Sequence, residues 1–180
     1  NKIIDDMLDF ARARGVELKK TAFDAWLDGV LNELGAPSGV TVRRMLGAPK
    51  ACPAIDDERI RRAIVNIYDN AYQAMIEEPV GRYPARKKKL TVSTKVTKGR
   101  LELAITDNGP GMPPEVFAAA FEPLYSTKGF GVGLGLPIVK QIMEQHDGGI
   151  EITCEHGSGT RVVLWLPLGQ STTKTKNGVK

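Results

Sequence analysis

The sequence predicts one globular domain of mixed α/β class. Several segments carry apolar residues at helical spacing, and they are interleaved with segments in which apolar and polar residues alternate, as in half-buried strands. The chain has 180 residues, of which 42% are hydrophobic, and this suits one domain with a sizeable core. We therefore expect a single domain with short appendages.

Composition narrows the functional classes. No apolar run approaches the length of a membrane span and no signal-peptide pattern opens the sequence, so we expect a soluble, cytoplasmic segment without membrane contact. Cys52 and Cys154 are far apart and form no disulfide framework or metal signature, which favours a reducing compartment. The net charge of +4 arises largely in residues 82–89 and 174–180, which we interpret as solvated loops. Charge alone therefore gives little reason to expect nucleic-acid binding.

The N-terminal part predicts helices and short strands. Residues 1–14 keep an apolar stripe typical of the end of a helix that continues outside this sequence. A short extended piece over 16–20 leads to Thr21–Asp24, which is similar to a capping box with Asp in the last position. The helix that follows ends at Gly35, and strands are expected over 40–45 and 54–55. The apolar face of this helix consists of Phe23, Trp26, Leu27, Val30, Leu31 and Leu34.

The next predicted helix begins at the acidic residues 56–58, which suit the helix dipole, and runs until Pro79. At about 100° per residue, Asn66, Asn70 and Gln73 fall within roughly 60° of one another, along the border of the apolar stripe. Two interpretations are open from this helix alone. The three amides form a polar helix margin, or they supply oxygen to Mg²⁺, a cation that prefers oxygen ligands.

A β-hairpin is predicted over 90–105, because apolar residues alternate on both sides of a turn at Lys98–Gly99. The same alternation places Asp107 on the buried side of the second strand. A buried carboxylate is costly unless a donor meets it. Asp107 either serves the turn chemistry of Asp-Asn-Gly, or it accepts the exocyclic amino group of adenine and rejects guanine, which has a carbonyl at that position.

Two glycine clusters flank an irregular stretch that contains Lys128. Glycine lets the backbone approach a ligand closely, and unpaired N–H groups at a helix start favour an anion. We therefore expect this segment to close over a nucleotide, with Lys128 either solvated or clamping a phosphate. The glycines are Gly109 and Gly111 in the first cluster and Gly131, Gly133 and Gly135 in the second.

The remaining elements complete the pattern. A short helix from residue 113 is expected to carry Phe117 and Phe121, and a second helix runs over 134–145. Strands are expected over 150–154 and 160–166. Thr160 points inward like Asp107, so the two would share one bound group if their strands are neighbours.

Five motifs in this order resemble the ATP-binding catalytic domain of sensor histidine kinases, in the superfamily that includes gyrase, MutL and the ninety-kilodalton heat-shock chaperone. Residues 66–74 resemble the N box, 107–112 the first glycine box, 121–128 the F box, 131–136 the second glycine box and 157–160 the last. The Asn-Ala-x-Gln-Ala and Ser-Thr-Lys variants are most similar to the nitrogen-regulation kinases.

The resemblance implies a Bergerat-type two-layer α/β sandwich, with a mixed, mainly antiparallel sheet packed on three helices, and it implies MgATP as the ligand. Asn70 would ligate Mg²⁺, and Asp107 would hold adenine with help from Thr160 through water. Asn66 and Gln73 would lie near the phosphates or the metal. The complete implied set is Asn66, Asn70, Gln73, Asp107, Gly109, Gly111, Lys128, Gly131, Gly133, Gly135, Leu136 and Thr160.

The resemblance also implies a division of the chain and its partners. Residues 1–14 would be a remnant of a dimerisation and phosphoacceptor helix, 15–169 the ATP-binding domain and 170–180 a polar disordered tail. The partners would be a histidine-containing dimerisation domain of the same parent protein, as a homodimer, and the receiver domain of a response regulator.

The sequence departs from the pattern of the superfamily in two respects that affect the expected chemistry. His146 lies in a helix-ending segment and His156 in a turn, so neither is a credible phosphoacceptor, and no catalytic base is assigned. Asn66 stands where ATP-hydrolysing relatives carry a glutamate, and an amide cannot take a proton from water. Histidine kinase chemistry is therefore expected. The alternatives are an ATPase or serine-kinase relative and a non-catalytic ATP-sensing docking module.

Overall fold

The computed structural model describes residues 15–76, 87–122 and 133–169. The predictions for residues 1–14 and 170–180, and those for Lys128 and Gly131, lie outside these described ranges. Within them, no helix is long and apolar enough to cross a membrane.

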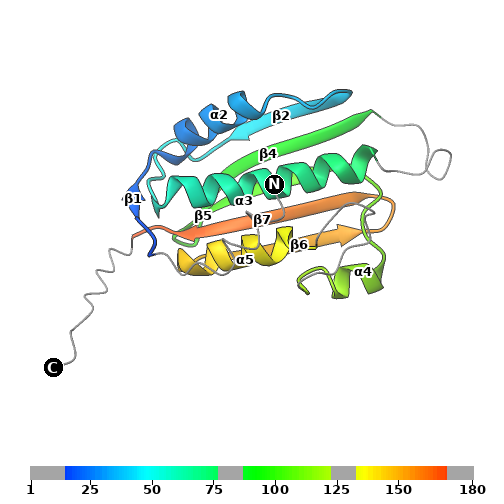
Figure 1. The fold of residues 1–180 in the computed structure, drawn as a ribbon. Coiled ribbons are helices and arrows are strands. Elements are labelled where there is room, and N and C mark those ends of the chain that lie inside the picture. The colour runs from blue at the N-terminus through cyan, green and yellow to red at the C-terminus, as the bar shows by residue number, and fades with distance from the viewer. Residues whose placement is uncertain (1–14, 77–86, 123–132, 170–180) are drawn as a thin grey trace.

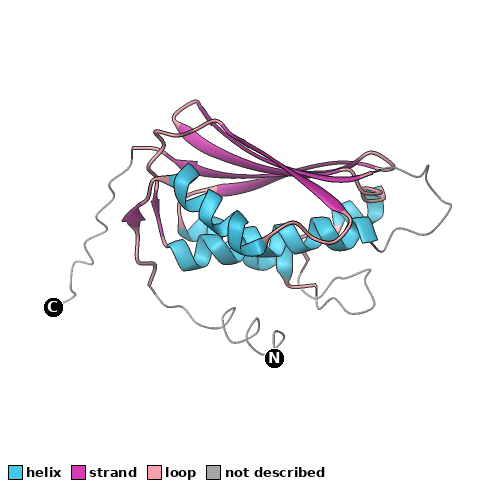
Figure 2. Ribbon diagram, turned by 90° about the horizontal axis from the view of Figure 1, so that it is seen from above, coloured by secondary structure: helices cyan, strands magenta, loops and turns pink. Residues whose placement is uncertain are grey.

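Helices α2 (Phe23–Leu34), α3 (Asp57–Ile76) and α5 (Gly135–Gln145) cover one face of a five-stranded sheet (Figures 1 and 2). The sheet has the order β2–β4–β5–β7–β6, in which β2 pairs parallel with β4 and the other pairs are antiparallel. The mixed, mainly antiparallel two-layer fold is thus confirmed. The strands are β2 (Val40–Leu46), β4 (Lys88–Thr97), β5 (Arg100–Asp107), β6 (Gly149–Glu155) and β7 (Gly159–Pro167).

Two short elements complete the arrangement. Strands β1 (Lys19–Lys20) and β3 (Ala54–Ile55) pair antiparallel as a separate two-stranded sheet. Helix α4 (Pro114–Ala118) has Pro113 as its N-cap residue and none of its residues is buried. The prediction that this helix carries both Phe117 and Phe121 is wrong for Phe121, which lies beyond its end.

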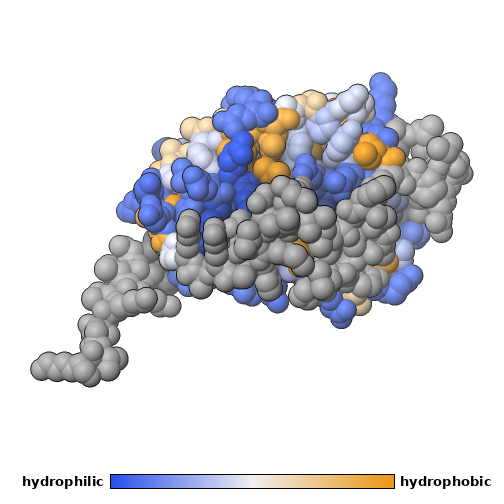
Figure 3. All heavy atoms as spheres, in the orientation of Figure 1, coloured by the Kyte–Doolittle hydropathy of each residue, from blue (hydrophilic) through white to orange (hydrophobic). Residues whose placement is uncertain are grey.

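The core lies between the sheet and the three helices. Alternate residues of β5, Leu101, Leu103 and Ile105, face the helical layer and are at most 2% exposed. They meet the apolar stripes of the helices, including Leu27 of α2 and Ile64 of α3, both fully buried. Burial of each such side chain contributes about 1.5–3 kcal/mol. Seen from the helical side, the described surface is mostly hydrophilic with small hydrophobic areas (Figure 3).

The predicted capping box at Thr21–Asp24 is wrong. The N-cap residue of α2 is Ala22, and no side chain of the described residues caps the helix. Asp24 is 8% exposed and turns into the protein, where it accepts the backbone N–H of Ala48 at 2.8 Å and the hydroxyl of Thr94 at 2.7 Å. These two donors compensate the cost of burying the carboxylate, and they tie α2 to β4 and to the loop after β2.

His146 joins the end of α5 to the start of α3. The ring is 3% exposed; its Nδ1 lies 2.7 Å from the carbonyl oxygen of Ile142, and its Nε2 accepts the N–H of Asp56 at 3.0 Å. Both contacts are satisfied by a neutral ring protonated at Nδ1. Burial lowers the pKa of His146, which outweighs the opposing effects of the Ile142 carbonyl and Asp56. The buried ring is unsuited to accept a phosphoryl group.

Candidate functional site

Asp107 ends β5 and faces the helical layer, as the alternation predicts. Its side chain is 6% exposed, and its Oδ1 accepts the backbone N–H groups of Gly109 at 2.8 Å and Thr160 at 3.3 Å. The second contact arises because β5 pairs with β7 and Thr106 lies opposite Arg161. Asp107 and Thr160 are therefore neighbours, which meets the condition stated for sharing one bound group, and two fixed donors orient the carboxylate.

The loop after Asp107 packs against the turn between β6 and β7, and this packing requires glycine. Gly111 has φ +68°, and a Cβ there would lie 2.3 Å from the carbonyl oxygen of Glu155. Gly159 has φ +114°, and a Cβ there would lie 2.2 Å from the carbonyl oxygen of Asp107. Gly157 donates its N–H to the carbonyl of Pro110 at 2.6 Å. The two loops hold each other in place through their backbones.

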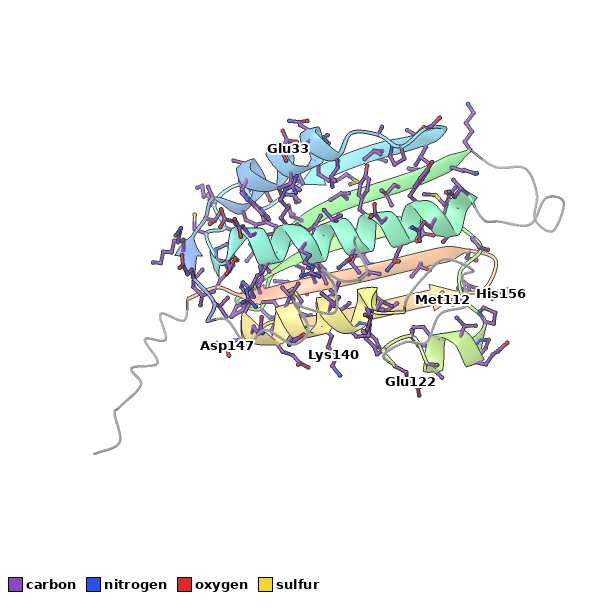
Figure 4. The ribbon with its side chains drawn as sticks, viewed as in Figure 1. Glu33, Met112, Glu122, Lys140, Asp147 and His156 are labelled. Carbon is purple, nitrogen blue, oxygen red and sulfur yellow. The ribbon has the colours of Figure 1, made fainter. Side chains whose placement is uncertain are left out.

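Two polar side chains that the sequence analysis did not single out fix this loop. Cys154 Sγ accepts the N–H of Met112 at 2.9 Å and lies 3.4 Å from the hydroxyl of Thr160. Asn108 accepts the N–H of Lys89 at 2.7 Å and donates to the carbonyl of Lys87 at 2.9 Å. Alternation places Cys154 on one face of its strand, but only the pairing of β6 with β7 sets it opposite Thr160. Figure 4 shows Met112 and His156 at this end of the domain, and Asp147 at the other end of α5.

Helix α3 lies beside this loop, and its Asn70 amide lies beside the start of α5. A Cβ on Gly135 would lie 3.5 Å from Asn70 Nδ2, so the α5 backbone begins in contact with that amide. A Cβ on Gly109 would lie 3.4 Å from the Met75 side chain and 3.6 Å from the backbone of Ala74. The structure thus brings the first glycine loop, the last turns of α3 and the first turn of α5 together on one side of the sheet.

Asn66 is more deeply buried than the interpretation as a helix margin requires. It is 8% exposed, and among the described residues its Nδ2 has no hydrogen-bond partner. A buried donor without a partner costs about 1–3 kcal/mol, so it points to a ligand that would accept the bond. Asn70 and Gln73 are half-buried.

The predicted metal ligands on α3 are the oxygens of amide side chains. In the described part of the chain, no group of three or more His, Cys, Asp or Glu side chains is placed to hold a metal ion. Amide oxygens suit a hard cation that keeps several waters and shares the oxygens of a bound phosphate. Asn70 and its neighbours therefore fit Mg²⁺ bound together with a phosphate ligand.

A large cavity lies elsewhere. It measures about 540 Å³ and lies at the opposite end of the sheet, between the loop after β2 and the ends of β4 and β7. Its lining includes Pro49, Val96 and Leu168, and none of the predicted site residues that the structure describes. Of the predicted set, the structure places Gly133 just before α5, and Gly135 and Leu136 in its first turn.

Comparison with known proteins points in one direction. The histidine kinase-, DNA gyrase B- and HSP90-like ATPase family matches residues 55–170. The sensor histidine kinase ZraS of Escherichia coli K12 is 26% identical over 171 residues, which cover 93% of this chain and 35% of ZraS. The sensory histidine kinase/phosphatase NtrB of Vibrio alginolyticus is 33% identical over 117 residues, covering 63% of this chain and 33% of NtrB. The chain thus spans about a third of the length of these relatives.

Solved structures share the fold. Full-length ShkA in complex with AMPPNP superposes with a TM-score of 0.76 at 24% identity, covering 96% of this chain and 36% of ShkA. The histidine kinase ThkA in complex with the response regulator TrrA gives a TM-score of 0.73 at 18% identity, covering 93% of this chain and 47% of that chain.

Proposed function

Because the chain belongs to the histidine kinase-, DNA gyrase B- and HSP90-like ATPase family, and its relatives are sensor histidine kinases, we propose that it binds MgATP and transfers the γ-phosphoryl group to a histidine. The acceptor histidine would belong to a dimerisation domain of the same parent protein. One observation carries the proposal: the fixed carboxylate of Asp107 and the amides of α3 lie on the same side of the sheet, where Gly109 packs against Ala74 and Met75 of α3 and Gly135 packs against Asn70.

At the adenine end, Asp107 accepts the exocyclic amino group. The N–H groups of Gly109 and Thr160 hold its Oδ1, so the carboxylate is oriented before the base arrives. Guanine presents a carbonyl oxygen at that position, and two facing acceptors repel each other. The hydroxyl of Thr160, held near Cys154, contacts the base through water.

At the phosphate end, Asn70 would provide an oxygen for Mg²⁺, and the Asn66 amide, whose Nδ2 has no partner among the described residues, would donate to a phosphate. Gln73, Gly133, Gly135 and Leu136 complete the described part of this end, and Lys128 and Gly131 are assigned to it from the motif alone. The bound MgATP supplies the transferable phosphoryl group and the cation that neutralises its charge. The residues of this chain bind and orient it, which is the larger part of such catalysis.

The rival ATPase reaction needs a group that takes a proton from water. Asn66 stands at the position where ATP-hydrolysing relatives carry a glutamate, and its amide is not basic enough to take a proton from water. Kinase chemistry is therefore the better fit. We also propose a response regulator as the next phosphoryl acceptor, because ThkA forms a complex with the response regulator TrrA. The proposal further includes a cytoplasmic setting and a homodimeric parent protein.

The decisive experiment mixes this chain with a separately produced dimerisation domain that carries an acceptor histidine. Acid-labile phosphate on that domain after addition of MgATP supports the proposal. Tight ATP binding without transfer favours the docking module, and phosphate release that is independent of the added domain favours the ATPase. An Asn70→Asp variant tests the metal end: its Mg²⁺ titration should differ from that of the unmodified protein, and identical titrations would make Asn70 a helix margin only.

A further inference from the structure

Helices α2, α3 and α5 lie on one side of the sheet and leave its other face uncovered by helices (Figure 2). The charged side chains on this outer face divide it into two electrostatically different halves. Strand register identifies the side chains that share this face, because successive residues alternate between faces and paired residues lie side by side. The orientation of β2 follows from Arg44, which contacts Asp28 of α2 at 2.7 Å, so Arg43 points to the outer face.

The half toward the β4–β5 turn is neutralised internally. Glu102 is 6% exposed and bonds Arg100 at 2.7 Å and Lys95 at 3.0 Å. Arg100 also contacts Glu151 at 3.1 Å and lies over the ring of Trp165, 5.2 Å from its centroid. Every charge in this cluster has an opposite charge beside it.

The other half, near the Asp107 end of the sheet, is cationic. Arg43 pairs with Thr91, Thr91 with Thr106, and Thr106 with Arg161, so two arginines flank two threonine hydroxyls in one row across four strands. Lys89 lies two residues before Thr91 on the same face. In the described structure, no carboxylate lies within 4.0 Å of a charged nitrogen of these three cations.

These cations are available to a partner. Arg43, Lys89 and Arg161 are all exposed, and Arg161 lies along the sheet, donating to the Thr106 hydroxyl at 3.3 Å. The carboxylate that register places in this half is Glu155, at the end of edge strand β6; it is diagonal to Arg161 and lies on the opposite edge of the sheet from Arg43. The row from Arg43 to Arg161 crosses three strand spacings, about 14 Å. A single small anion cannot span that distance.

We propose that this cationic half-face, defined by Arg43, Lys89 and Arg161 with Thr91 and Thr106, docks an acidic surface of a partner protein. Guanidinium groups bind carboxylates in a two-pronged geometry, and the threonine hydroxyls between them add donors. Binding to single-stranded nucleic acid would use exposed aromatic rings for stacking. The outer-face aromatic of the described strands, Trp165, lies in the neutralised half under Arg100 and against Gly149.

The test measures binding of a fluorescein-labelled octaglutamate peptide by anisotropy, at low and physiological salt. We expect Arg43→Glu/Arg161→Glu to weaken binding about ten-fold. The matched control, Lys19→Glu/Lys50→Glu, makes the same change in net charge at exposed positions elsewhere and should stay within two-fold of the unmodified protein. Arg43→Lys/Arg161→Lys keeps the charge and removes the two-pronged geometry, and it should show an intermediate loss.

Several results would overturn the proposal: no octaglutamate binding to the unmodified protein, an equal loss in the control variant, or unchanged binding in the charge-reversed variant. Tighter binding of a ten-residue oligothymidylate that is lost on reversal would make the surface a nucleic-acid site instead. Thermal melts and ATP binding of all variants, measured in parallel, show that each is folded. Because the half-face does not include the ATP site, the result of the octaglutamate binding test is independent of the proposed kinase activity.

Discussion

Replacing Asp107 by asparagine separates the adenine role of this residue from its structural role. In the unmodified protein, one carboxylate oxygen accepts the N–H groups of Gly109 and Thr160. The amide oxygen of Asp107→Asn can accept both of these bonds, so the loop should keep its conformation. The amide nitrogen, however, presents a donor to the donating amino group of adenine.

The expected loss follows from these contacts. A hydrogen bond to a charged group contributes about 1.5–3 kcal/mol, and a buried donor without an acceptor costs about 1–3 kcal/mol. Allowing for partial relaxation, we expect ATP binding to weaken by about 2–4 kcal/mol, roughly 30- to 1000-fold. Guanine offers a carbonyl to the new donor, so the ratio of GTP to ATP affinity should rise by at least about ten-fold.

Calorimetric titration with ATP and GTP in the presence of Mg²⁺ measures both quantities. Asp107→Ala is the informative comparison, because it removes the acceptor for both N–H groups and should lower the melting temperature as well as the affinity. A folded Asp107→Asn protein that binds ATP within three-fold of the unmodified protein would refute the assignment of Asp107 to the base.

Three further predictions concern the scaffold. Gly111→Ala should impair both folding and ATP binding, because the added Cβ would meet the Glu155 carbonyl. Gly29→Ala is the matched control in α2, where a Cβ has open space, and it should raise the free energy of unfolding by about 0.5–1 kcal/mol in urea titrations. Asp24→Ala leaves the Ala48 N–H and the Thr94 hydroxyl without their acceptor, and it should lower the free energy of unfolding by about 2–4 kcal/mol in the same titrations. The folded variant should keep its ATP affinity. Folding lowers the pKa of His146, so the unfolded chain takes up a proton at a higher pH than the folded protein does. The contribution of His146 to the free energy of unfolding should therefore be constant above about pH 6.5 and fall below it by up to about 1.4 kcal/mol per pH unit. Melts at pH 5–8 measure this profile, and His146→Gln should flatten it.

Local periodicity was sufficient to predict most of the helices and strands. The alternation in β5 predicted that Asp107 faces the core, and the structure confirms it because each residue in a strand reverses direction. The family resemblance predicted the sheet on one side and the helices on the other, and the parallel pair β2–β4 agrees with the expected mixed sheet.

The failures came from contacts between residues distant in sequence. Asp24 sits at a position typical of a helix cap, but its partners are Ala48 and Thr94, which no local pattern reveals. The support of the glycine loop by Cys154 likewise depends on a pairing 42 residues away. The depth of Asn66 depends on how α3 packs against its neighbours, and the periodicity of one helix cannot give that depth.

Helix α5 is anchored differently at its two ends. One end rests on Asn70 through a glycine without a side chain, and the other is fixed by the His146 ring to the start of α3. Asp56 also accepts the N–H of Glu17. Between its two ends, α5 buries Ile138, Val139, Ile142 and Met143 in the core, so the helix is held along its whole length. One well-packed helix therefore connects the start of α3 with the Asn70 amide.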